Sequence, residues 1–255
     1  MKIASWNVNS LNVRLPHLRD WLASAQPDVV ALQETKMEDA KFPADEIAAL
    51  GYACVYSGQK TYNGVAILAR GEPPRDVITD IPDLDDPQRR ILIATVADIR
   101  IVDLYVVNGQ EVGSEKYTYK LDWLGKVRTF LAEEIRRHPN LVVLGDFNIA
   151  PDDRDVHDPV IWHEQILCST PERDALKAMF ALGLHDSFRL FDESAGQFSW
   201  WDYRQGAFRR NLGLRIDLIL ASEALRKRCR GASIDRAPRT WERPSDHTPV
   251  VLELE

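Results

Sequence analysis

Apolar runs of strand length and amphipathic stretches of helical spacing alternate along the chain, and several runs end abruptly at a polar residue. These runs predict strands over residues 2–6, 28–32, 52–56, 64–69, 91–96, 101–107, 141–144, 197–203, 215–221 and 250–254. Helical spacing predicts helices over residues 15–25, 44–50, 117–138 and 171–182, with Pro16 in the first turn of the first helix. Several predicted strands follow one another directly, which argues against a purely doubly wound sheet. We therefore expect an α/β fold, a four-layer sandwich of two packed mixed β-sheets flanked by helices.

The apolar run over residues 141–144 ends in Gly145, Asp146, Phe147 and Asn148. A buried strand that stops in this way delivers polar side chains to the edge of a sheet. Side chains two residues apart on an extended chain point to the same side, so Asp146 and Asn148 can converge on one substrate atom or one metal ion. An Asx-turn, in which both side chains bond only to nearby backbone, explains this stretch equally well when it is taken alone.

Polar residues lie at the ends of other predicted strands as well, namely Asn7, Glu34, Tyr105, Asp246 and His247. A lone glutamate at such a place is most often a solvated strand end. Asp217 differs because it lies inside the apolar run of residues 215–221, and an unpaired buried carboxylate costs several kcal/mol. His247 is its natural partner.

Together these strand-end residues form the inventory of a metal-dependent phosphoester hydrolase. Carboxylates and carboxamides supply the hard oxygen ligands that Mg²⁺ prefers, and a carboxylate can take a proton from water. Histidine and tyrosine can stabilise charge on phosphoryl oxygens. A serine hydrolase is rejected, because the chain has no Gly-x-Ser-x-Gly elbow and Ser245 is too close in sequence to His247.

The composition predicts one soluble domain over residues 1–255. With 45% hydrophobic residues the chain can build a sizeable core, and no linker, charge block or repeat divides it. The net charge of -7 argues against a uniformly basic nucleic-acid-coating protein but not against a local basic face. Three cysteines without metal-site spacing indicate a reduced, cytoplasmic protein. Neither a membrane span nor a targeting segment is expected, because no apolar run approaches roughly 20 residues.

Several stretches bear on contact with nucleic acid. The run from Arg204 to Arg215 interleaves arginines with aromatic and apolar residues, which is the strongest local signature of such contact in the chain. Residues 58–63 form a polar, basic and aromatic loop that could hold a phosphodiester backbone, although a plain hairpin loop is at least as common. The charged segment of residues 152–158 is expected to be a solvated loop rather than a cation site. Trp200 and Trp201 are neighbours on a predicted strand, so at most one should face a site while the other packs in the core.

A family resemblance rests on Asn7, Leu32-Gln33-Glu34, Tyr105 with Asn108-Gly109, Gly145-Asp146-Phe147-Asn148, Arg215-Ile216-Asp217 and Ser245-Asp246-His247. These motifs resemble the endonuclease/exonuclease/phosphatase superfamily. Within it the chain resembles the exonuclease III family of abasic-site DNA-repair nucleases, in order and nearly from end to end. The segments over residues 201–217 and 242–247 separate it from the lipid and inositol phosphatases of the same superfamily.

The resemblance implies a role for each strand-end residue. Glu34 would be the principal Mg²⁺ ligand, with Mn²⁺ as an alternative metal, and Asn7 and Asp246 would complete or orient the metal shell. Asp146 would activate the attacking water, and Asn148 would hold that water and a phosphate oxygen. His247, kept cationic by Asp217, would donate to the scissile phosphate, with Tyr105 beside it. The implied metal set is Glu34, Asn7, Asp246, Asp146, Asn148 and His247.

By the same resemblance the substrate is duplex DNA with abasic sites or damaged 3′ ends, and the enzyme acts as a monomer. An abasic sugar flips out at lower cost than a paired nucleotide and fits a small apolar pocket, here formed by Phe208, Leu214 and one of Trp200 or Trp201. Expected contacts to the DNA backbone are Arg14, Lys60, Tyr62, Asn63, Asn108 and Arg154. Family members commonly carry proline within the Tyr-x-x-Asn segment, whereas Val106 and Val107 stand here, which predicts a looser loop.

Two other functions share part of this inventory. A non-catalytic nucleic-acid-binding regulator on the same scaffold would have no need of the metal ligands, all of which are present. A phosphatase for a small phosphorylated metabolite or lipid would share the chemistry but leave the 204–215 run without a role. Abasic endonuclease, 3′ to 5′ exonuclease and 3′ phosphatase activities would share one site, so the sequence leaves their balance open.

Overall fold

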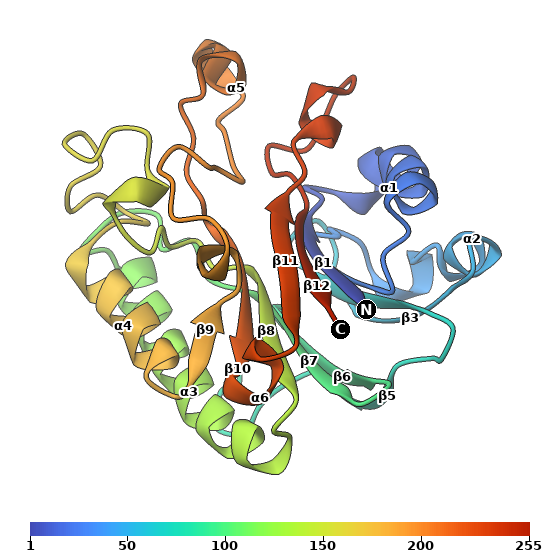
Figure 1. Cartoon of the computed structure of the whole chain (residues 1–255). Coiled ribbons are helices and arrows are strands. Elements are labelled where there is room, and N and C mark those ends of the chain that lie inside the picture. The colour runs from blue at the N-terminus through green and yellow to red at the C-terminus, as the bar shows by residue number, and fades with distance from the viewer.

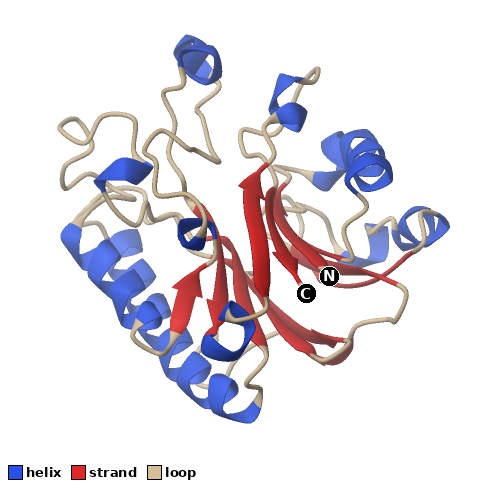
Figure 2. Ribbon diagram, in the orientation of Figure 1, coloured by secondary structure: helices blue, strands red, loops and turns tan.

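Two six-stranded mixed sheets lie face to face in the computed structural model, which describes all 255 residues (Figures 1 and 2). In spatial order, the strands of the first sheet are β11 (Cys229–Ile234), β12 (Val250–Leu254), β1 (Lys2–Asn7), β2 (Val29–Gln33), β4 (Val65–Arg70) and β3 (Tyr52–Ser57). Those of the second sheet are β5 (Arg75–Ile78), β6 (Ile91–Val96), β7 (Ile99–Tyr105), β8 (Leu141–Asp146), β10 (Asp217–Ser222) and β9 (Leu184–Asp186).

Helices cover the outer face of each sheet (Figure 2). The first sheet is covered by α1 (Leu11–Ala25) and α2 (Ala44–Ala49), and the second by α3 (Glu115–Arg137) and α4 (Thr170–Phe180). The remaining helices are α5 (Ala207–Arg210), α6 (Glu223–Arg226) and the 3₁₀ turns η1 (Asp39–Lys41), η2 (Asp153–Asp155), η3 (Phe188–Leu190), η4 (Arg204–Gly206) and η5 (Ala237–Thr240). The expected four-layer sandwich is confirmed. No helix is long and apolar enough to cross a membrane.

The alternation of side chains along each strand divides the core into three layers. One layer fills the space between the sheets, and the other two lie beneath the helices on either side. Along β8, Val142 and Leu144 belong to the layer between the sheets, while Val143 belongs to the layer beneath α3. Asp146 continues the face of Val142 and Leu144, so its carboxylate emerges at the end of the space between the two sheets.

The strand pairing brings the polar strand ends of both sheets to the same end of the sandwich. In the first sheet β1 and β2 run parallel, with Asn7 opposite Gln33. In the second sheet β7 and β8 run parallel, with Tyr105 opposite Asp146, and antiparallel β10 places Asp217 on the other side of Asp146. Because carboxyl ends of parallel strands share an edge, Asn7, Tyr105 and Asp146 face one region.

The first helix begins earlier than the sequence pattern predicts. It starts at Leu11 rather than at residue 15, so the prediction that Pro16 lies in the first turn is wrong. Pro16 lies in the second turn, where it offers no N–H to the carbonyl of Asn12. Asn12 is exposed, so solvent can satisfy that carbonyl. Ser10, which precedes the helix, donates its N–H to the carbonyl of Glu34, and this bond ties the helix start to the end of β2.

The aromatic segment over residues 197–203 is not a strand. It pairs only through isolated bridges of Trp200 with Leu214 and with His247. Its aromatic residues suit a pleated surface, but tertiary contacts override that propensity. Strands β5, β9 and β11 were not predicted, because β5 is mostly exposed, β9 has three residues and β11 contains a bulge.

Candidate active site

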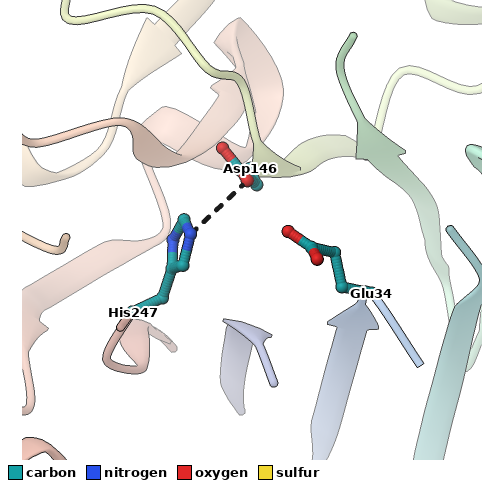
Figure 3. Close-up of side chains that lie close together, drawn as sticks. All are labelled: Glu34, Asp146 and His247. Carbon is teal, nitrogen blue, oxygen red and sulfur yellow. Dashed lines mark ion pairs between the residues drawn. The ribbon is translucent and has the colours of Figure 1, made fainter. Parts of the chain in front are cut away.

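Glu34, Asp146 and His247 point toward one another at the shared end of the sheets (Figure 3). One ligand atom of each residue lies within 4.8 Å of the others, and His247 Nε2 is 3.8 Å from Asp146 Oδ2. Gly145, just before Asp146, adopts a φ of +139°, and a Cβ there would lie 1.9 Å from the carbonyl oxygen of Leu104. Glycine is therefore required for β8 to pack closely on β7 as it enters the site.

Asn7 connects the two carboxylates, which come from different sheets. Its Nδ2 donates to Glu34 Oε1 at 2.8 Å and to Asp146 Oδ2 at 2.9 Å. Its Oδ1 accepts the backbone N–H of Asn9 at 3.0 Å, which fixes the orientation of the amide. In this arrangement Asn7 orients both carboxylates through its nitrogen.

Lys36 lies on the other oxygen of Glu34. Its Nζ is 2.8 Å from Glu34 Oε2 and donates to Asn9 Oδ1 at 2.6 Å. Burial raises the pKa of Glu34, but the Lys36 ammonium and the Asn7 amide outweigh it and hold the pKa below its ordinary value. Sequence reasoning missed both Asn9 and Lys36. The available signal was their position two residues beyond Asn7 and Glu34.

Asp146 and His247 are both buried, and each shifts the pKa of the other. Burial raises the pKa of Asp146 to about 7, and the nearby Asp217 and Glu34 carboxylates add to the rise while His247 opposes it. Burial lowers the pKa of His247, but Asp217 and Asp146 overcome that and raise it to about 10. His247 is therefore an imidazolium at neutral pH.

Asp217 holds the imidazole of His247 as the sequence predicted. Its carboxylate accepts from His247 Nδ1 at 2.9 Å and 3.1 Å, and Ser199 Oγ donates to it at 2.6 Å. The Nε2 edge is thereby turned toward Asp146 and the open end of the site.

Asn148 adopts a φ of 48°, and both the nitrogen and the oxygen of its side-chain amide form hydrogen bonds. Its Nδ2 donates to the carbonyl of Val106 at 3.0 Å and to Asp146 Oδ2 at 3.2 Å, and its Oδ1 accepts from Asn108 Nδ2 at 3.1 Å. The segment of Val106 and Asn108 is thus joined to Asn148 by two hydrogen bonds, and whether the loop is loose without proline stays a prediction. Tyr105 lies beneath the Arg90 guanidinium, 4.5 Å from the ring centre, and burial together with Glu34 raises its pKa well above the ordinary value.

Asp246 lies outside the group formed by Glu34, Asp146 and His247. Its carboxylate accepts from Asn9 Nδ2 at 2.9 Å and from Trp200 Nε1 at 3.0 Å. Trp200 is half-buried and Trp201 is fully buried, so one tryptophan faces the site and the other packs in the core, as expected.

The predicted apolar pocket does not have the expected walls. Leu214 has no exposed surface, and Phe208 packs edge-on against Trp201 with ring centres 5.0 Å apart. A pocket of about 380 Å³ does adjoin Trp200, and its other lining residues are His157, Trp162, Asp202, Arg204, Gln205, Ala207 and Leu212. Of the residues predicted for an apolar pocket, Trp200 lies in this wall, whereas Phe208 and Leu214 do not, because Leu214 is buried in the core and Phe208 packs against Trp201.

The predicted rim residues differ in how free they are to contact a ligand. Lys60, Tyr62 and Asn108 are exposed, and the side chain of Asn108 is bonded to that of Asn148. The other three have partners within the protein: Asn63 with Gln59, Arg14 with Tyr203 and Pro244, and Arg154 with Asp152 and Glu193. Arg215, the last arginine of the 204–215 run, is buried and bonded to Asp155 and Asp186, so it cannot contact nucleic acid.

The donor set of the site fits a hard divalent cation. Glu34 and Asp146 offer carboxylate oxygens, the ligand type that such cations prefer. Two carboxylates this close repel one another, and burial already raises the pKa of Asp146, so a cation between them would relieve both effects.

Comparison with known proteins agrees with this geometry. The sequence profile of the Endonuclease/Exonuclease/phosphatase family matches residues 4–247. Exodeoxyribonuclease III of Haemophilus influenzae is 34% identical over the full length of both chains. The 3′ phosphatase NExo from Neisseria bound to a product DNA hairpin superposes with a TM-score of 0.98, at 48% identity, covering 100% of this chain and 99% of that one. An AP endonuclease from Archaeoglobus fulgidus superposes with a TM-score of 0.96, at 37% identity and the same coverage. The chain therefore belongs to the endonuclease/exonuclease/phosphatase family, among the relatives of exodeoxyribonuclease III.

Proposed function

We propose that this protein is a Mg²⁺-dependent DNA-repair nuclease that hydrolyses phosphodiester bonds at abasic sites and 3′ termini of duplex DNA. The observation that carries the proposal is the convergence of Glu34, Asp146 and His247 from separate strand ends, with ligand atoms within 4.8 Å. Relatives named for exodeoxyribonuclease, AP endonuclease and 3′ phosphatase activities support the substrate class.

The metal would be held by Glu34 and Asp146, with Asn7 orienting both carboxylates. Bound there, Mg²⁺ or Mn²⁺ would neutralise charge that develops on the phosphoryl and leaving oxygens. Asp246 is held by Asn9 and Trp200 at the border of this group, where its role is to orient the surrounding shell.

The chain's own groups supply the proton transfers and the charge stabilisation. Asp146, whose Oδ2 faces His247 and the reaction centre, is positioned to accept a proton from the attacking water. The His247 imidazolium, oriented by Asp217, donates to a non-bridging phosphate oxygen. The raised pKa of Tyr105 keeps its hydroxyl protonated, so that it donates toward the phosphate beside Glu34.

The DNA would lie across the rim of the shared sheet end. Lys60, Tyr62 and Asn108 are exposed there, and Arg14 and Arg154 would add charge from positions that also brace loops. The pocket beside Trp200 is the candidate receptor for an abasic sugar or a terminal nucleotide. We propose that residues 1–255 act as one domain and as a monomer. A cytoplasmic location suits a DNA-repair role and the three free cysteines.

A single set of labelled duplexes tests the proposal. The set carries an abasic site, a 3′ phosphate or a recessed 3′ end, and each duplex is incubated with Mg²⁺ and again with a chelator. We expect metal-dependent cleavage of at least one duplex, and at least a 10²-fold loss of rate in Asp146→Asn and in Glu34→Ala. DNA binding should remain measurable in both variants.

Asp45→Asn, on the exposed surface of α2, is the matched control and should keep the wild-type rate. Unchanged cleavage in Asp146→Asn would remove the proposal. Excess duplex DNA should inhibit any hydrolysis of a small phosphomonoester by this protein. The rate of a metabolite phosphatase would not change when duplex DNA is added.

A further inference from the structure

Lys120 of helix α3 has its ammonium group buried in the protein interior, next to the backbone of Asn148 in the active site. Lys120 forms an ion pair with Glu172 of α4, and both side chains are 0% exposed. The two helices lie side by side over the second sheet in Figure 1. Desolvation of two charges offsets most of their attraction, so a buried pair is a poor device for stability alone. Its hydrogen bonds indicate another use.

All three N–H donors of the Lys120 ammonium are occupied. One donates to Glu172 Oε1 at 2.5 Å, one to the carbonyl oxygen of Asn148 at 2.7 Å and one to the carbonyl oxygen of Asn108 at 3.1 Å. These carbonyls belong to the two residues whose side-chain amides bond to each other at 3.1 Å. One buried cation therefore holds the backbone of both members of the amide pair beside Asp146.

Neither of these backbone segments is held by regular structure. Asn148 has a φ of 48°, and Gly109, next to Asn108, has a φ of +91°. A Cβ on Gly109 would lie 3.1 Å from Lys120 Cδ, so the lysine chain runs against this glycine. The segment of Val106, Val107 and Asn108 contains no proline to restrict it. Lys120 supplies the fixation that the backbone itself lacks.

Glu172 is fixed in turn by the start of α4. Its carboxylate accepts the backbone N–H of Leu167 and of Ser169, each at 3.1 Å, and the Ser169 hydroxyl at 2.6 Å. Burial lowers the pKa of Lys120, and the Glu172 charge opposes that shift. The carboxylate thus determines where the ammonium lies and favours its charged form.

We propose that Lys120 is a positioning residue for the reaction: through two carbonyl oxygens it sets the places of the Asn108 and Asn148 amides beside Asp146. Glu172 serves to place the ammonium. The proposal rests on the proposed nuclease function. Because Lys120 has no exposed surface, it acts through the two asparagines and does not touch substrate.

Two variants separate positioning from stability. Lys120→Met with Glu172→Leu removes both charges, but it leaves the two carbonyls and the Leu167 and Ser169 donors without partners, so we expect it to melt lower than the wild type. Its kcat on the labelled duplexes should fall about 10²-fold, because the amide pair loses its support, while binding of DNA in chelator remains measurable. Glu172→Gln alone leaves the lysine bonds to both carbonyls. It should melt lower than the wild type and yet keep a kcat near the wild-type value.

The same helix offers a matched control. Arg100 and Glu134 form a second buried ion pair, with N and O 2.6 Å apart and both side chains 3% exposed, near the other end of α3. Neither residue bonds to a site residue. Arg100→Met with Glu134→Leu should therefore keep the wild-type kcat whatever it does to melting.

A readout without catalysis distinguishes failure of this proposal from failure of the nuclease function. The ¹⁵N side-chain amide resonances of Asn108 and Asn148 should shift in the Lys120/Glu172 double variant and stay in place in the Arg100/Glu134 control. Unshifted resonances or a wild-type kcat in the double variant would each overturn the positioning role, as would a loss of kcat in Glu172→Gln equal to that of the double variant. If the wild type cleaves no duplex while the resonances shift, the nuclease function fails and the positioning of the amides stands.

Discussion

The two carboxylate oxygens of Asp146 have different partners. Oδ1 accepts the backbone N–H of Asn148 at 2.9 Å, which closes an Asx-turn. Oδ2 accepts the Asn7 amide at 2.9 Å and faces His247. One oxygen therefore fixes the carboxylate while the other stays directed at the reaction centre. A single residue can in this way be both a turn element and a reactive group.

Asp103 lies on β7, two residues before Tyr105, and has no exposed surface. Gln33 Nε2 donates to its Oδ1 at 2.7 Å, and its Oδ2 has no hydrogen-bond partner. Burial raises the pKa of Asp103 well above the ordinary value. The folded protein therefore favours the neutral acid at this position.

Asp103→Asn should make folding stability less dependent on pH. The unfolded chain releases this proton near pH 4, whereas the folded protein keeps it to higher pH. Between these points the folded state binds more protons, so wild-type stability falls as pH rises from about 4. Asparagine cannot ionise, and the melting temperature of the variant should exceed that of the wild type by an amount that grows between about pH 5 and 8. A difference that stays constant with pH would contradict this reasoning, and Asp45→Asn provides the exposed control.

At this scale the sequence identifies residues that follow an apolar run, because a buried strand must end at the surface. Glu34 and Asp146 were found in this way, and His247 was found as the partner that buried Asp217 requires. Lys120 was not found, because its partners are distant in sequence and its own neighbourhood looks like ordinary helix. Lys36 was missed although its partner Glu34 is only two residues away, because a lysine in a loop is usually solvated. Phe208 and Leu214 were misplaced because apolar residues near a site carry no signal that distinguishes a pocket wall from core.

At the scale of elements, the charged segment around η2 is not wholly the solvated loop that its composition predicts, because one of its residues, Asp155, is a buried anchor. Asp155 has no exposed surface and lies between two guanidinium groups, Arg215 at 2.6 Å and Arg189 at 2.5 Å. Arg215 also binds Asp186 of β9 at 2.7 Å. These pairs join η2 to β9 and to the segment that enters β10, and so fix the approach to Asp217.

Asp155→Asn should lower the free energy of unfolding by about 3–5 kcal/mol, because it leaves buried guanidinium charge without its partner. The arginines hold the pKa of Asp155 below its ordinary value against the effect of burial. Its contribution is therefore present above the unfolded-state pKa of about 4 and is lost as pH falls through the depressed value. Urea unfolding at neutral pH measures the loss.

Asp153→Asn is the control for this change. Asp153 also pairs with an arginine, Arg173, but its side chain is 70% exposed. An exposed pair contributes about 0–1 kcal/mol, so this variant should unfold close to the wild type. Equal losses in the two variants would show that burial of Asp155 is not what matters.

Element prediction succeeded where periodicity was long. The α3 pattern gave residues 117–138 and the structure has Glu115–Arg137, a helix whose Ser114 cap accepts the N–H of Tyr117. The strands β5, β9 and β11 at the sheet edges were not predicted, because an exposed edge strand needs no apolar alternation. The prediction of a strand over residues 197–203 was wrong for the opposite reason. Its aromatic residues favour a strand, but the segment pairs with other chain segments only at isolated bridges.

At the scale of the molecule, a chain of net charge -7 must bind a polyanion through local charge. Arg209 and Arg210 of α5 are exposed and form no ion pair. They lie shortly before Asp217, at the end of the sandwich that carries the site, and Figure 1 shows α5 projecting beyond the sheets there. Arg226 and Lys227, at α6, lie at the opposite end of β10.

Arg209→Gln with Arg210→Gln should weaken DNA binding at low salt. The slope of log K against log salt should fall by about 1 for each phosphate that an arginine no longer neutralises. Arg226→Gln with Lys227→Gln makes the same change in net charge at the other end and should leave the slope unchanged. Fluorescence anisotropy with a duplex over a salt series, in chelator, measures both. Equal slopes for the two double variants would mean that net charge, rather than α5, governs binding.

The sandwich itself was predictable because directly successive strands exclude crossover helices between them. How the two sheets face each other was not, since the register across the interior depends on packing of residues far apart in sequence. That register determines the site: Glu34 follows β2 of one sheet, and Asp146 ends β8 of the other. A cation held between these carboxylates would join the two sheets.

Divalent metal should therefore stabilise the whole fold and not only the loops of the site. A ligand present at 100 times its Kd adds about 2.7 kcal/mol when it binds only the folded state. We expect Mg²⁺ or Mn²⁺ to raise the wild-type melting temperature and a chelator to reverse the rise. Glu34→Ala should abolish the shift, whereas Glu46→Ala on the exposed face of α2 should keep it. Because the cation would bridge the sheets, amide exchange in both β2 and β8 should slow on metal addition; slowing in one sheet alone would mean that the two carboxylates do not share the ion.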